Sequence, residues 1–345
     1  MIDRVLNFWR VVYVLMMARN KEFYRDRGVM IWSFLFPFLI VAAIGFAFSG
    51  GEQTVFTVGV YVPAAQADPD IPLLRESFIK HVTYDDFDQA LDRLRNFQVD
   101  LLLSAEQPDY YWMNEGSPTS RAMERLFLAE NGRAAMQRQT VTGQEIRYVD
   151  WVIPGVLGMN LMFGCLFGIG YVIVRYRKNG VLKRIQVTPV TPLQFLTAQV
   201  LSRLLVMVVV SVIIYAGCDL FLNFVMRGSY LDLIIVALLG IVAMIAFALI
   251  IASRTASEEL ANGLLNLATF PMLLLSEVWF SLDEAPNWLI FISQCLPLTH
   301  AVQAAREIML NGAGLGSLMY HVWVLLAMSI VFLAAASALF RWNEA

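Results

Sequence analysis

The residues best suited to specific chemistry lie in one polar stretch near the C-terminus, from Pro297 to Gly312. Thr299, His300 and Arg306 stand there, between segments apolar enough for a lipid bilayer. Because a charged guanidinium is costly in free hydrocarbon, Arg306 must lie at a membrane surface or pack into protein. In a transporter, such a position is where cargo is handled. His300, a lone histidine, is interpreted as a hydrogen-bonding residue at a helix start rather than a proton relay.

Motifs for catalysis are missing from the sequence. It has no G-x-x-x-x-G-K-[ST] loop, and its nearest glycine-rich piece, Gly312 to Ser317, lacks the lysine. It also has no H-E-x-x-H, no G-x-S-x-G and no histidine pair at ligand spacing, so we predict no catalytic, cofactor or metal site. If ATP drives this protein, a separate subunit must hydrolyse it. Cys165, Cys218 and Cys295 lie in apolar segments and are interpreted as core residues.

Two carboxylates lie within or beside apolar segments. Asp219, together with Asn223, is interpreted as reaching the headgroups at the outer end of a span, with a cation site as the alternative. Glu277 precedes Trp279, and aromatic residues are common at membrane interfaces, which favours an interfacial anchor. The alternative is that Glu277 lines an exit and favours cationic cargo.

The composition is that of a membrane protein, with 58% hydrophobic and only 15% charged residues in a chain of 345. Four stretches of 19 to 24 residues lack any Asp, Glu, Lys, Arg or His, and about 20 apolar residues suffice to cross a bilayer. A fifth is interrupted only by Asp219, and a shorter sixth contains Pro271. We therefore predict an α-helical polytopic membrane protein with six transmembrane helices, at 30–48, 151–174, 204–226, 233–252, 260–276 and 322–340.

The short flanks of these spans carry 14 basic residues on one side and 2, Arg227 and Arg306, on the other. Because positively charged flanks stay in the cytoplasm, both termini are expected on the cytoplasmic side. The membrane is expected to be the cell membrane, that is, the inner or plasma membrane. The basic side comprises Arg4, Arg10, Arg19, Lys21, Arg25, Arg27, Arg175, Arg177, Lys178, Lys183, Arg184, Arg203, Arg254 and Arg341.

Residues 49–150, between the first and second spans, differ in character, with 9 basic and 16 acidic residues. Strand-like runs at 54–62, 99–104 and 109–113 alternate with helical spacing at 85–96 and 117–139, so an α/β extracytoplasmic domain is expected. Ser117 and Pro118 are a good helix start. The domain contains no cysteine, so it has no disulfide framework.

Three further elements position the candidate residues. Residues 1–29 read as a cytoplasmic helix, lying in the membrane surface or packed on a partner. Residues 151–345 are expected to form a five-helix transmembrane domain. Within it, residues 176–192 form a basic cytoplasmic loop, and Thr191 and Pro192 begin the helix of the third span. Residues 277–312 are expected to form an outer re-entrant hairpin, because their apolar run 289–296 is too short to cross.

Two pairs of residues spaced four apart share helix faces, Gly164 with Gly168 and Asn262 with Asn266. Close helix packing and interhelical hydrogen bonding explain both pairs. A polar pore lining from the asparagines is the alternative.

The order of these parts resembles the type-2 ATP-binding-cassette (ABC) export permeases. The similarity rests on Tyr24 to Arg27, the KR…TP…P…F pattern of the basic loop, and the closing stretch with its PLTH…R…G signature from Pro297 to Gly312. Glu277 and Ser281 depart from the family pattern, in which Gly and Pro are common. The matching positions of the closing stretch are Pro271 to Ser276, Pro286, Trp288, Pro297, Thr299, His300, Arg306 and Gly312.

This resemblance implies a permease that exports a hydrophobic or amphipathic cargo, such as a drug, lipid or glycolipid, with a P-loop ATPase subunit and a second permease chain in the lipid bilayer. A periplasmic adaptor is a further implied partner, and nucleic acid is not. The loop residues that would press on the ATPase are Lys183, Arg184, Thr188, Pro189 and Pro192. The residues of the outer hairpin and exit would be Glu277, Trp279, Pro286, Trp288, Pro297, Thr299, His300 and Arg306. The alternatives are an ion-coupled secondary transporter and a non-transporting membrane receptor or assembly factor.

Overall fold

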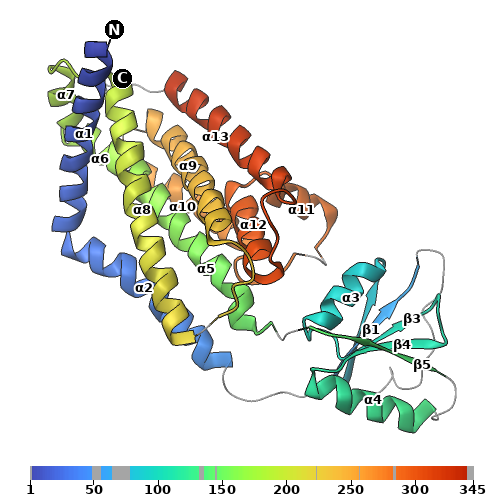
Figure 1. Ribbon diagram of the computed structural model, residues 1–345. Helices are drawn as coiled ribbons and strands as arrows, with labels where there is room; N and C mark the ends of the chain where they lie inside the picture. The colour runs from blue at the N-terminus through green and yellow to red at the C-terminus, as the bar shows by residue number, and fades with distance from the viewer. Residues whose placement is uncertain are drawn as a thin grey trace. The chain divides into compact units, whose positions relative to one another are not determined.

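The computed structural model describes residues 2–48, 56–63, 78–131, 136–143, 146–222, 224–255, 257–282 and 285–339 (Figure 1). The chain divides into two compact units, one formed by residues 1–48 with 149–345 and the other by residues 49–148. The first unit is helical, and the second combines strands with helices.

The helical unit begins with α1 (Ile2–Arg25) and α2 (Arg27–Phe48), which are bent by 73° relative to each other. Asp26 occupies the bend, and its carboxylate accepts a hydrogen bond from the Val29 amide at 3.1 Å. A carboxylate in this position caps the free amides of a new helix, so the first helix ends and the second begins within one residue. The boundary between the N-terminal helix and the first predicted span, expected after residue 29, thus lies at Asp26.

The next helix is continuous from Tyr148 to Lys178 but changes its hydrogen-bonding pattern in the middle. It consists of α5 (Tyr148–Cys165), the π-helical segment η2 (Leu166–Tyr171) and α6 (Val172–Lys178). The short α7 (Val181–Gln186) follows, and then the long α8 (Pro192–Leu222). The rest of this unit comprises α9 (Tyr230–Arg254), α10 (Glu258–Leu275), α11 (Asn287–Gln294), α12 (Pro297–Asn311) and α13 (Met319–Leu339).

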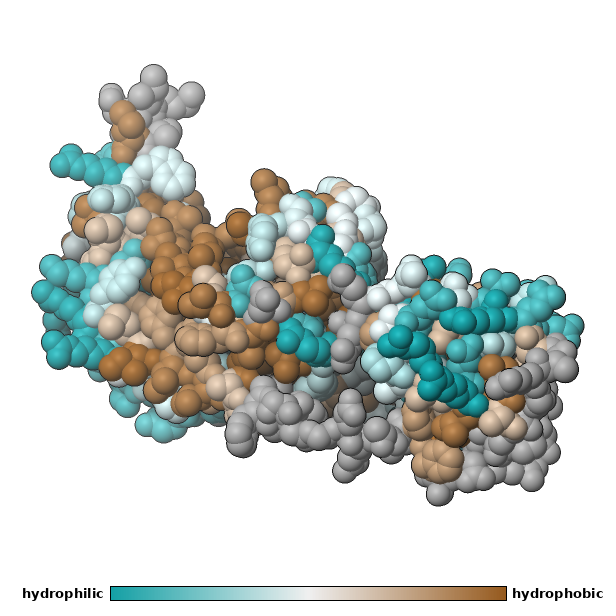
Figure 2. Space-filling model, turned by 60° about the horizontal axis from the view of Figure 1, so that its bottom comes forward, coloured by the Kyte–Doolittle hydropathy of each residue, from teal (hydrophilic) through white to brown (hydrophobic). Residues whose placement is uncertain are grey.

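The core of the helical unit is a large apolar cluster centred on α5, η2, α8 and α9. α13 packs along α9, and α1 packs along α8. In Figure 1 the start of α1, the short α7 and the end of α13 lie at the same end of this unit. Apolar side chains also cover much of its surface in Figure 2, and Leu220 and Phe221 of α8 are each 81% exposed. Such a surface suits contact with lipid.

Four of the described helices are long and apolar enough to cross a membrane: 148–178, 192–222, 230–253 and 319–339. The bent pair of α1 and α2 would add a fifth span. The expectation of six spans is therefore not confirmed. α10 forms where the sixth span was predicted, but Glu258, Glu259 and two asparagines make it too polar to qualify as a span by composition.

The helix of the third predicted span, 204–226, begins at Pro192, as its capping residues predict, but α8 ends at Leu222 rather than at residue 226. Its first turns carry Gln194, Gln199 and Arg203, whose side chains are buried within the helical unit rather than exposed to lipid. Burial against neighbouring helices allows these polar residues in a long apolar helix. Asp219 lies near the C-terminal end of α8, as expected, and Asn223 lies outside the described residues.

The α/β unit contains a mixed five-stranded sheet in the order β2-β1-β3-β4-β5. β1 (Phe56–Tyr61) pairs in parallel with β2 (Ile79–Tyr84) and β3 (Leu101–Ser104). β4 (Tyr110–Asn114) is antiparallel to β3 and parallel to β5 (Gln137–Val141). The register pairs Val58 with Leu101 and Leu102 with Trp112.

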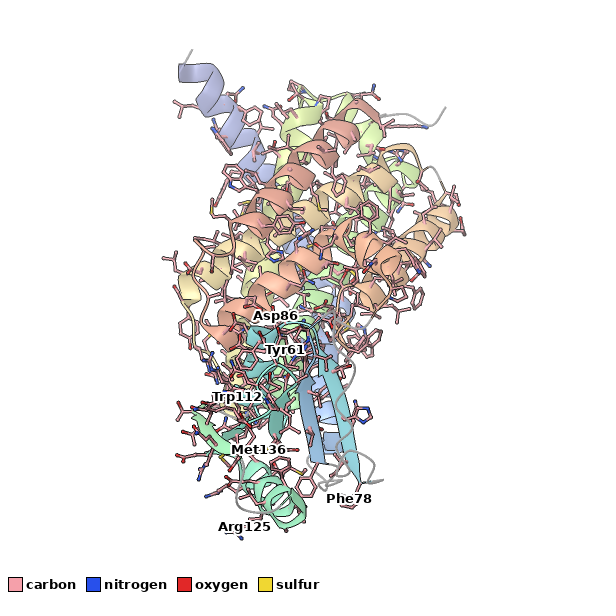
Figure 3. All side chains as sticks on the ribbon, turned by 90° about the vertical axis from the view of Figure 1, so that its right-hand side faces the viewer. Tyr61, Phe78, Asp86, Trp112, Arg125 and Met136 are labelled. Carbon is pink, nitrogen blue, oxygen red and sulfur yellow. The ribbon has the colours of Figure 1, made fainter. Side chains whose placement is uncertain are left out.

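Helices cover both faces of this sheet. Leu101 and Leu103 of β3 pack with Met123 and Phe127 of α4 (Pro118–Asn131). Leu102, which points to the opposite face, packs with Leu94 of α3 (Phe87–Arg95). Figure 3 shows the labelled Tyr61 and Trp112 near the α3 side, where both rings make edge contacts with Phe87.

The α/β character of this segment is as expected, whereas β2 and β5 were not predicted. The helix predicted over 117–139 ends at Asn131, and β5 takes its last part. β5 pairs only with β4, and Arg138 holds it to Glu115 by an ion pair of 2.7 Å. These contacts join distant residues, so helical spacing alone did not reveal the strand. The position of this unit outside the membrane stays a prediction.

Candidate functional site

The predicted coupling residues lie together on one exposed surface around α7, here called the α7 surface. Gly180 adopts a left-handed conformation with φ of 67° and lets the chain turn directly from α6 into α7. Leu182 is fully buried and anchors the short helix, and Thr191 forms a capping box with Gln194 at the start of α8. The exposed residues include Lys183, Arg184, Val187, Thr188, Pro189 and Pro192.

The α7 surface combines positive charge with exposed apolar area. Val187, between the charged helix and Thr188, is 87% exposed. Thr188 is held in place because its hydroxyl donates to the Ile185 carbonyl at 2.6 Å. A basic and apolar projection with a buried anchor is suited to docking on another protein rather than to chemistry.

Arg306 and Glu277, from opposite ends of the predicted hairpin, meet in a mostly buried ion pair. Arg306 Nη1 lies 3.0 Å from a carboxylate oxygen of Glu277, and Nη2 donates to the Glu277 carbonyl at 2.7 Å. Gln303 donates to the other carboxylate oxygen at 3.1 Å. The guanidinium lies 3.8 Å from the centre of the Trp151 ring. This cluster therefore ties α12 and the segment after α10 to the start of α5.

Glu277 also has an unusual backbone, with φ of 54°. This left-handed conformation is costly for a residue with a side chain and free for glycine. It explains physically why a glycine suits this position in the permeases that the chain resembles. Here the side chain is retained, and its carboxylate binds Arg306.

Thr299 and His300 form a second buried cluster beside it. The Thr299 hydroxyl donates to the Ser276 hydroxyl at 3.0 Å, and Ser293 donates to the Leu275 carbonyl at 2.6 Å, so α10, α11 and α12 are joined. His300 Nε2 lies 2.8 Å from the Gln294 carbonyl, which can only accept, so Nε2 carries the proton.

His300 is not isolated, contrary to expectation, because His321 of α13 approaches its Nδ1 at 3.0 Å. With Nε2 protonated, Nδ1 of His300 accepts and His321 donates. Burial lowers the pKa of His300 below its ordinary value, so the ring is neutral near pH 7. The cluster is therefore a hydrogen-bonded join between helices, with no charged relay at neutral pH.

The other hairpin residues occupy helix starts, the core and the surface. Pro297 is the first residue of α12, and Pro286 directly precedes α11, where a fixed φ suits a helix start. Trp288 is 64% exposed, and Trp279 packs against the core of the helical unit. Glu277, Thr299, His300 and Arg306 of the predicted set are thus brought into the two polar clusters described above.

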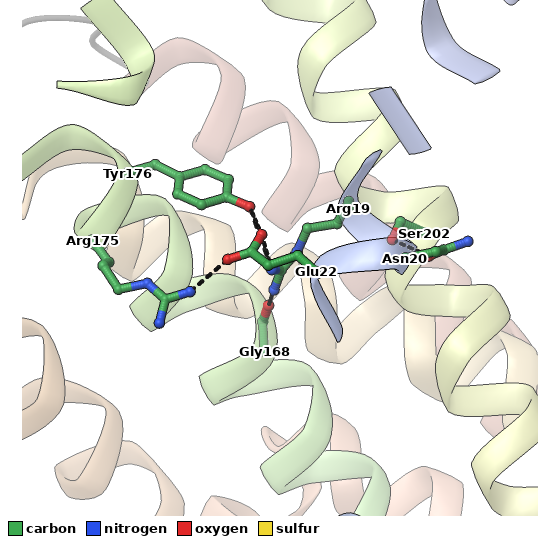
Figure 4. A network of polar contacts seen from close by, with 7 residues as sticks. All are labelled: Arg19, Asn20, Glu22, Gly168, Arg175, Tyr176 and Ser202. Carbon is green, nitrogen blue, oxygen red and sulfur yellow. Dashed lines mark hydrogen bonds and ion pairs between the residues drawn. The ribbon is translucent and has the colours of Figure 1, made fainter. Parts of the chain in front are cut away.

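One polar network was missed by the sequence interpretation (Figure 4). Glu22 of α1 binds Arg19 and Arg175 at 2.7 Å each, and Tyr176 donates to the same carboxylate. Arg19 also donates to the Gly168 carbonyl of η2 at 3.0 Å. The charge count uses Arg19 and Arg175 only to orient the protein in the membrane. Their joint position beside one acid on another helix could not be read from local spacing.

Arg177 was likewise counted only for its charge. It is buried, and it donates to the carbonyls of Ala252, Ser253 and Thr255 at the end of α9. These carbonyls have no partner within their own helix, and a cation compensates the negative end of the helix dipole. Arg177 therefore couples the end of α6, next to the α7 surface, to α9.

The chain is similar in sequence to two described transporters. A relative described as "Probable multidrug ABC transporter permease YbhR", from Escherichia coli (strain K12), is 24% identical over 198 residues, or 56% of this chain and 53% of the relative. "ABC transporter G family member 20" of Dictyostelium discoideum is 26% identical over 190 residues, or 52% of this chain and 24% of the relative. The matched region thus spans about half of the first relative and a quarter of the second.

The family described as ABC-2 type transporter matches residues 111–310, which include the α7 surface and both hairpin clusters except His321. This match covers more than half of the chain. Together with the apolar helices, it identifies a multi-pass membrane protein. The chain belongs to the ABC-2 type transporter family.

Proposed function

We propose that this chain is the membrane-spanning permease subunit of an ATP-driven exporter. The observation that carries the proposal is the α7 surface, a rigidly anchored basic and apolar projection within the region matched by the family. The sequence has no P-loop of its own. A separate P-loop ATPase would dock on this surface and convert ATP binding into movement of α6 and α8.

The contacts around α7 support such a transmission. Residues 179–180 join α7 to α6 and residues 187–191 join it to α8, and Arg177 connects α6 to the end of α9. Lys178 of α6 lies 3.8 Å from carboxylates of Glu258 and Glu259 at the start of α10. A push on α7 would thus reach several long helices through short polar links. Two permease chains would pair over two ATPase subunits, with the α7 surface in the cytoplasm.

The proposed cargo is hydrophobic or amphipathic. The name of the Escherichia coli relative refers to multidrug transport, and an apolar bundle suits such compounds. We assign the hairpin from 277 to 312 a structural role at the outer exit, with the Glu277–Arg306 pair holding it on α5.

The coupling proposal is tested by reversing charge on the α7 surface with Lys183→Glu and Arg184→Glu. The tagged chain is extracted in detergent, and retention of a P-loop ATPase is measured by mass spectrometry together with the ATPase activity of the complex. We expect about tenfold lower retention and activity in the double variant, because charge reversal places like charges opposite each other where a basic surface docks on an acidic partner.

The matched control reverses two exposed charges of the α/β unit, Lys80→Glu and Arg125→Glu. It should retain the ATPase at the wild-type level. Equal retention by the α7 variant, with normal insertion shown by size-exclusion chromatography, would place the coupling surface elsewhere. Absence of any P-loop ATPase from the wild-type complex would contradict the exporter assignment itself.

A further inference from the structure

A cavity of about 610 Å³ lies in the helical unit between α1, α2, the α5–η2 helix and α8. This volume is within the range of sites for small amphipathic molecules. Its apolar wall includes Trp32, Phe163, Phe167 and Met207. Its polar wall includes the Glu22 network of Figure 4 and one more cation, Arg203.

Arg203 has an unusual environment for a charged residue. It lies inside α8 and is only 9% exposed. Its described contact is the face of the Phe23 ring, 5.8 Å from the guanidinium, and its Nε has no hydrogen-bond partner. A buried donor of a charged group that lacks a hydrogen-bonding acceptor is costly, so a protein rarely retains one without use.

Two glycines of the facing helix make room for this guanidinium. A Cβ at Gly168 would lie 2.1 Å from Cζ of Arg203, and a Cβ at Gly164 would lie 2.3 Å from Met207. The pair predicted to permit close helix packing therefore accommodates these two side chains at the cavity wall. The geometry places Arg203 where a larger neighbour would displace it.

The acids of the cavity are already engaged. Both oxygens of Glu22 bind arginine side chains, and Asp26 accepts from the Val29 amide at the start of α2. The unsatisfied groups are donors instead, namely Nε of Arg203 and the side-chain amide nitrogen of Asn160. The cavity thus offers donors and one positive charge beside an aromatic wall.

We propose that this cavity binds an anionic amphiphile, with a carboxylate or phosphate head on Arg203 and Asn160 and an apolar tail along Phe163, Phe167 and Met207. A planar guanidinium is well matched to such heads. This site goes beyond the proposed export function, because the ligand is defined by its chemistry whether it is cargo or a resident membrane lipid.

The test uses dodecyl phosphate as the probe and the full-length chain in phosphatidylcholine nanodiscs. Binding is measured by calorimetry for the wild type, Arg203→Met, Arg203→Gln and Gly168→Ala. We expect about tenfold or greater weakening in all three variants, because a charge-assisted hydrogen bond is lost or displaced. Gly168→Ala leaves the Arg203 guanidinium in the chain but displaces it from its place at the cavity wall. The control Arg125→Gln, exposed on α4, should bind as the wild type does.

Three comparisons define the ligand. Dodecyltrimethylammonium should bind at least about tenfold more weakly than dodecyl phosphate, since Arg19, Arg175 and Arg203 outnumber Glu22 and Asp26 in the cavity lining. Inorganic phosphate should not compete at equal concentration, since it lacks the tail. In nanodiscs containing phosphatidylglycerol, this lipid is available to occupy the cavity. Weaker binding of the probe, together with phosphatidylglycerol retained on the protein in native mass spectra, would identify a bilayer lipid as the source of the ligand. Unchanged affinity for the probe in these nanodiscs would identify a free amphiphile as the ligand. Either result supports the proposal that the ligand has an anionic head.

A stability measurement keeps the test decisive if binding is weak. Without ligand, Arg203→Met should melt no lower than the wild type, because an unpaired buried charge is removed. Dodecyl phosphate should raise the melting temperature of the wild type and not of this variant. Unchanged probe affinity in Arg203→Met and Gly168→Ala would overturn the proposal, as would stronger binding of the cationic amphiphile.

Discussion

Glu277 makes two opposing contributions to the stability of the fold. Its left-handed backbone costs about 1–2 kcal/mol relative to glycine. Its carboxylate, however, is the partner of a guanidinium whose side chain is only 10% exposed. Breaking a buried pair by removing one member costs about 3–5 kcal/mol. The ion pair therefore outweighs the backbone cost and explains how a non-glycine residue is accommodated here.

We predict that Glu277→Gln lowers the free energy of unfolding by roughly 3 kcal/mol, because Arg306 loses its charged partner. Glu277→Gly should be no more destabilising, since glycine recovers about 1 kcal/mol from the backbone. Thermal denaturation in detergent checks both values. Glu307→Gln, whose contact with Asn311 is exposed, is the control and should be near neutral.

A clear excess loss in Glu277→Gly over Glu277→Gln would show that backbone strain is unimportant at this position. The same variants address cargo charge. Because Arg306 already neutralises the carboxylate, export of cationic and neutral compounds should fall together in Glu277→Gln. Selective loss of cationic export would instead favour the exit interpretation of Glu277.

The join between α5 and the segment after α10 depends on close backbone approach. A Cβ at Gly155 would lie 2.4 Å from the Val278 carbonyl oxygen, which belongs to the backbone and cannot simply rotate away. By contrast, a Cβ at Gly263, on the exposed face of α10, would meet nothing within 4 Å. Both glycines are helical, so they form a matched pair.

We predict opposite effects of alanine at these two positions. Gly155→Ala should destabilise by about 1–3 kcal/mol, because the Val278 backbone must move and with it the neighbouring Glu277. Gly263→Ala should stabilise by about 0.5–1 kcal/mol through helix propensity. Melting temperatures of the two variants in the same detergent provide the measurement. Equal effects at the two sites would mean that α5 and this segment do not pack as described.

The topology of the whole chain is open to a direct labelling experiment. Cys295 is exposed rather than in the core as expected, so Cys295→Ser gives a background in which the remaining Cys165 and Cys218 are buried. We predict that Glu106→Cys, on the α/β unit, reacts with an impermeant maleimide in intact cells. Lys21→Cys, on α1, should react only after lysis, because the basic flanks are held in the cytoplasm.

The reverse pattern would invert the protein in the membrane and place the α7 surface outside. That result would also exclude docking of a cytoplasmic ATPase there. Labelling of both positions in intact cells would contradict the separation of α1 from the α/β unit by a membrane span.

Much of the organisation followed from local signals in the sequence. Long apolar runs, basic flanks and the capping residues Thr191 and Ser117 predicted most helices, the α/β character of residues 49–150 and the exposed basic loop around Lys183. These signals are local, because hydropathy, capping and backbone preferences act between residues close in the chain. They do not depend on which helices become neighbours.

The pairing of polar groups was decided only by tertiary structure. Glu277 and Arg306 are 29 residues apart, and His300 and His321 are 21 apart, so their contact required the helices to pack in one arrangement. The cavity beside Arg203 likewise arises only where α1, α2, the α5–η2 helix and α8 meet. A charge count treats Arg203 as an orientation signal, whereas burial beside Gly168 makes it a candidate ligand-binding residue, because only packing determines which charges lose contact with water.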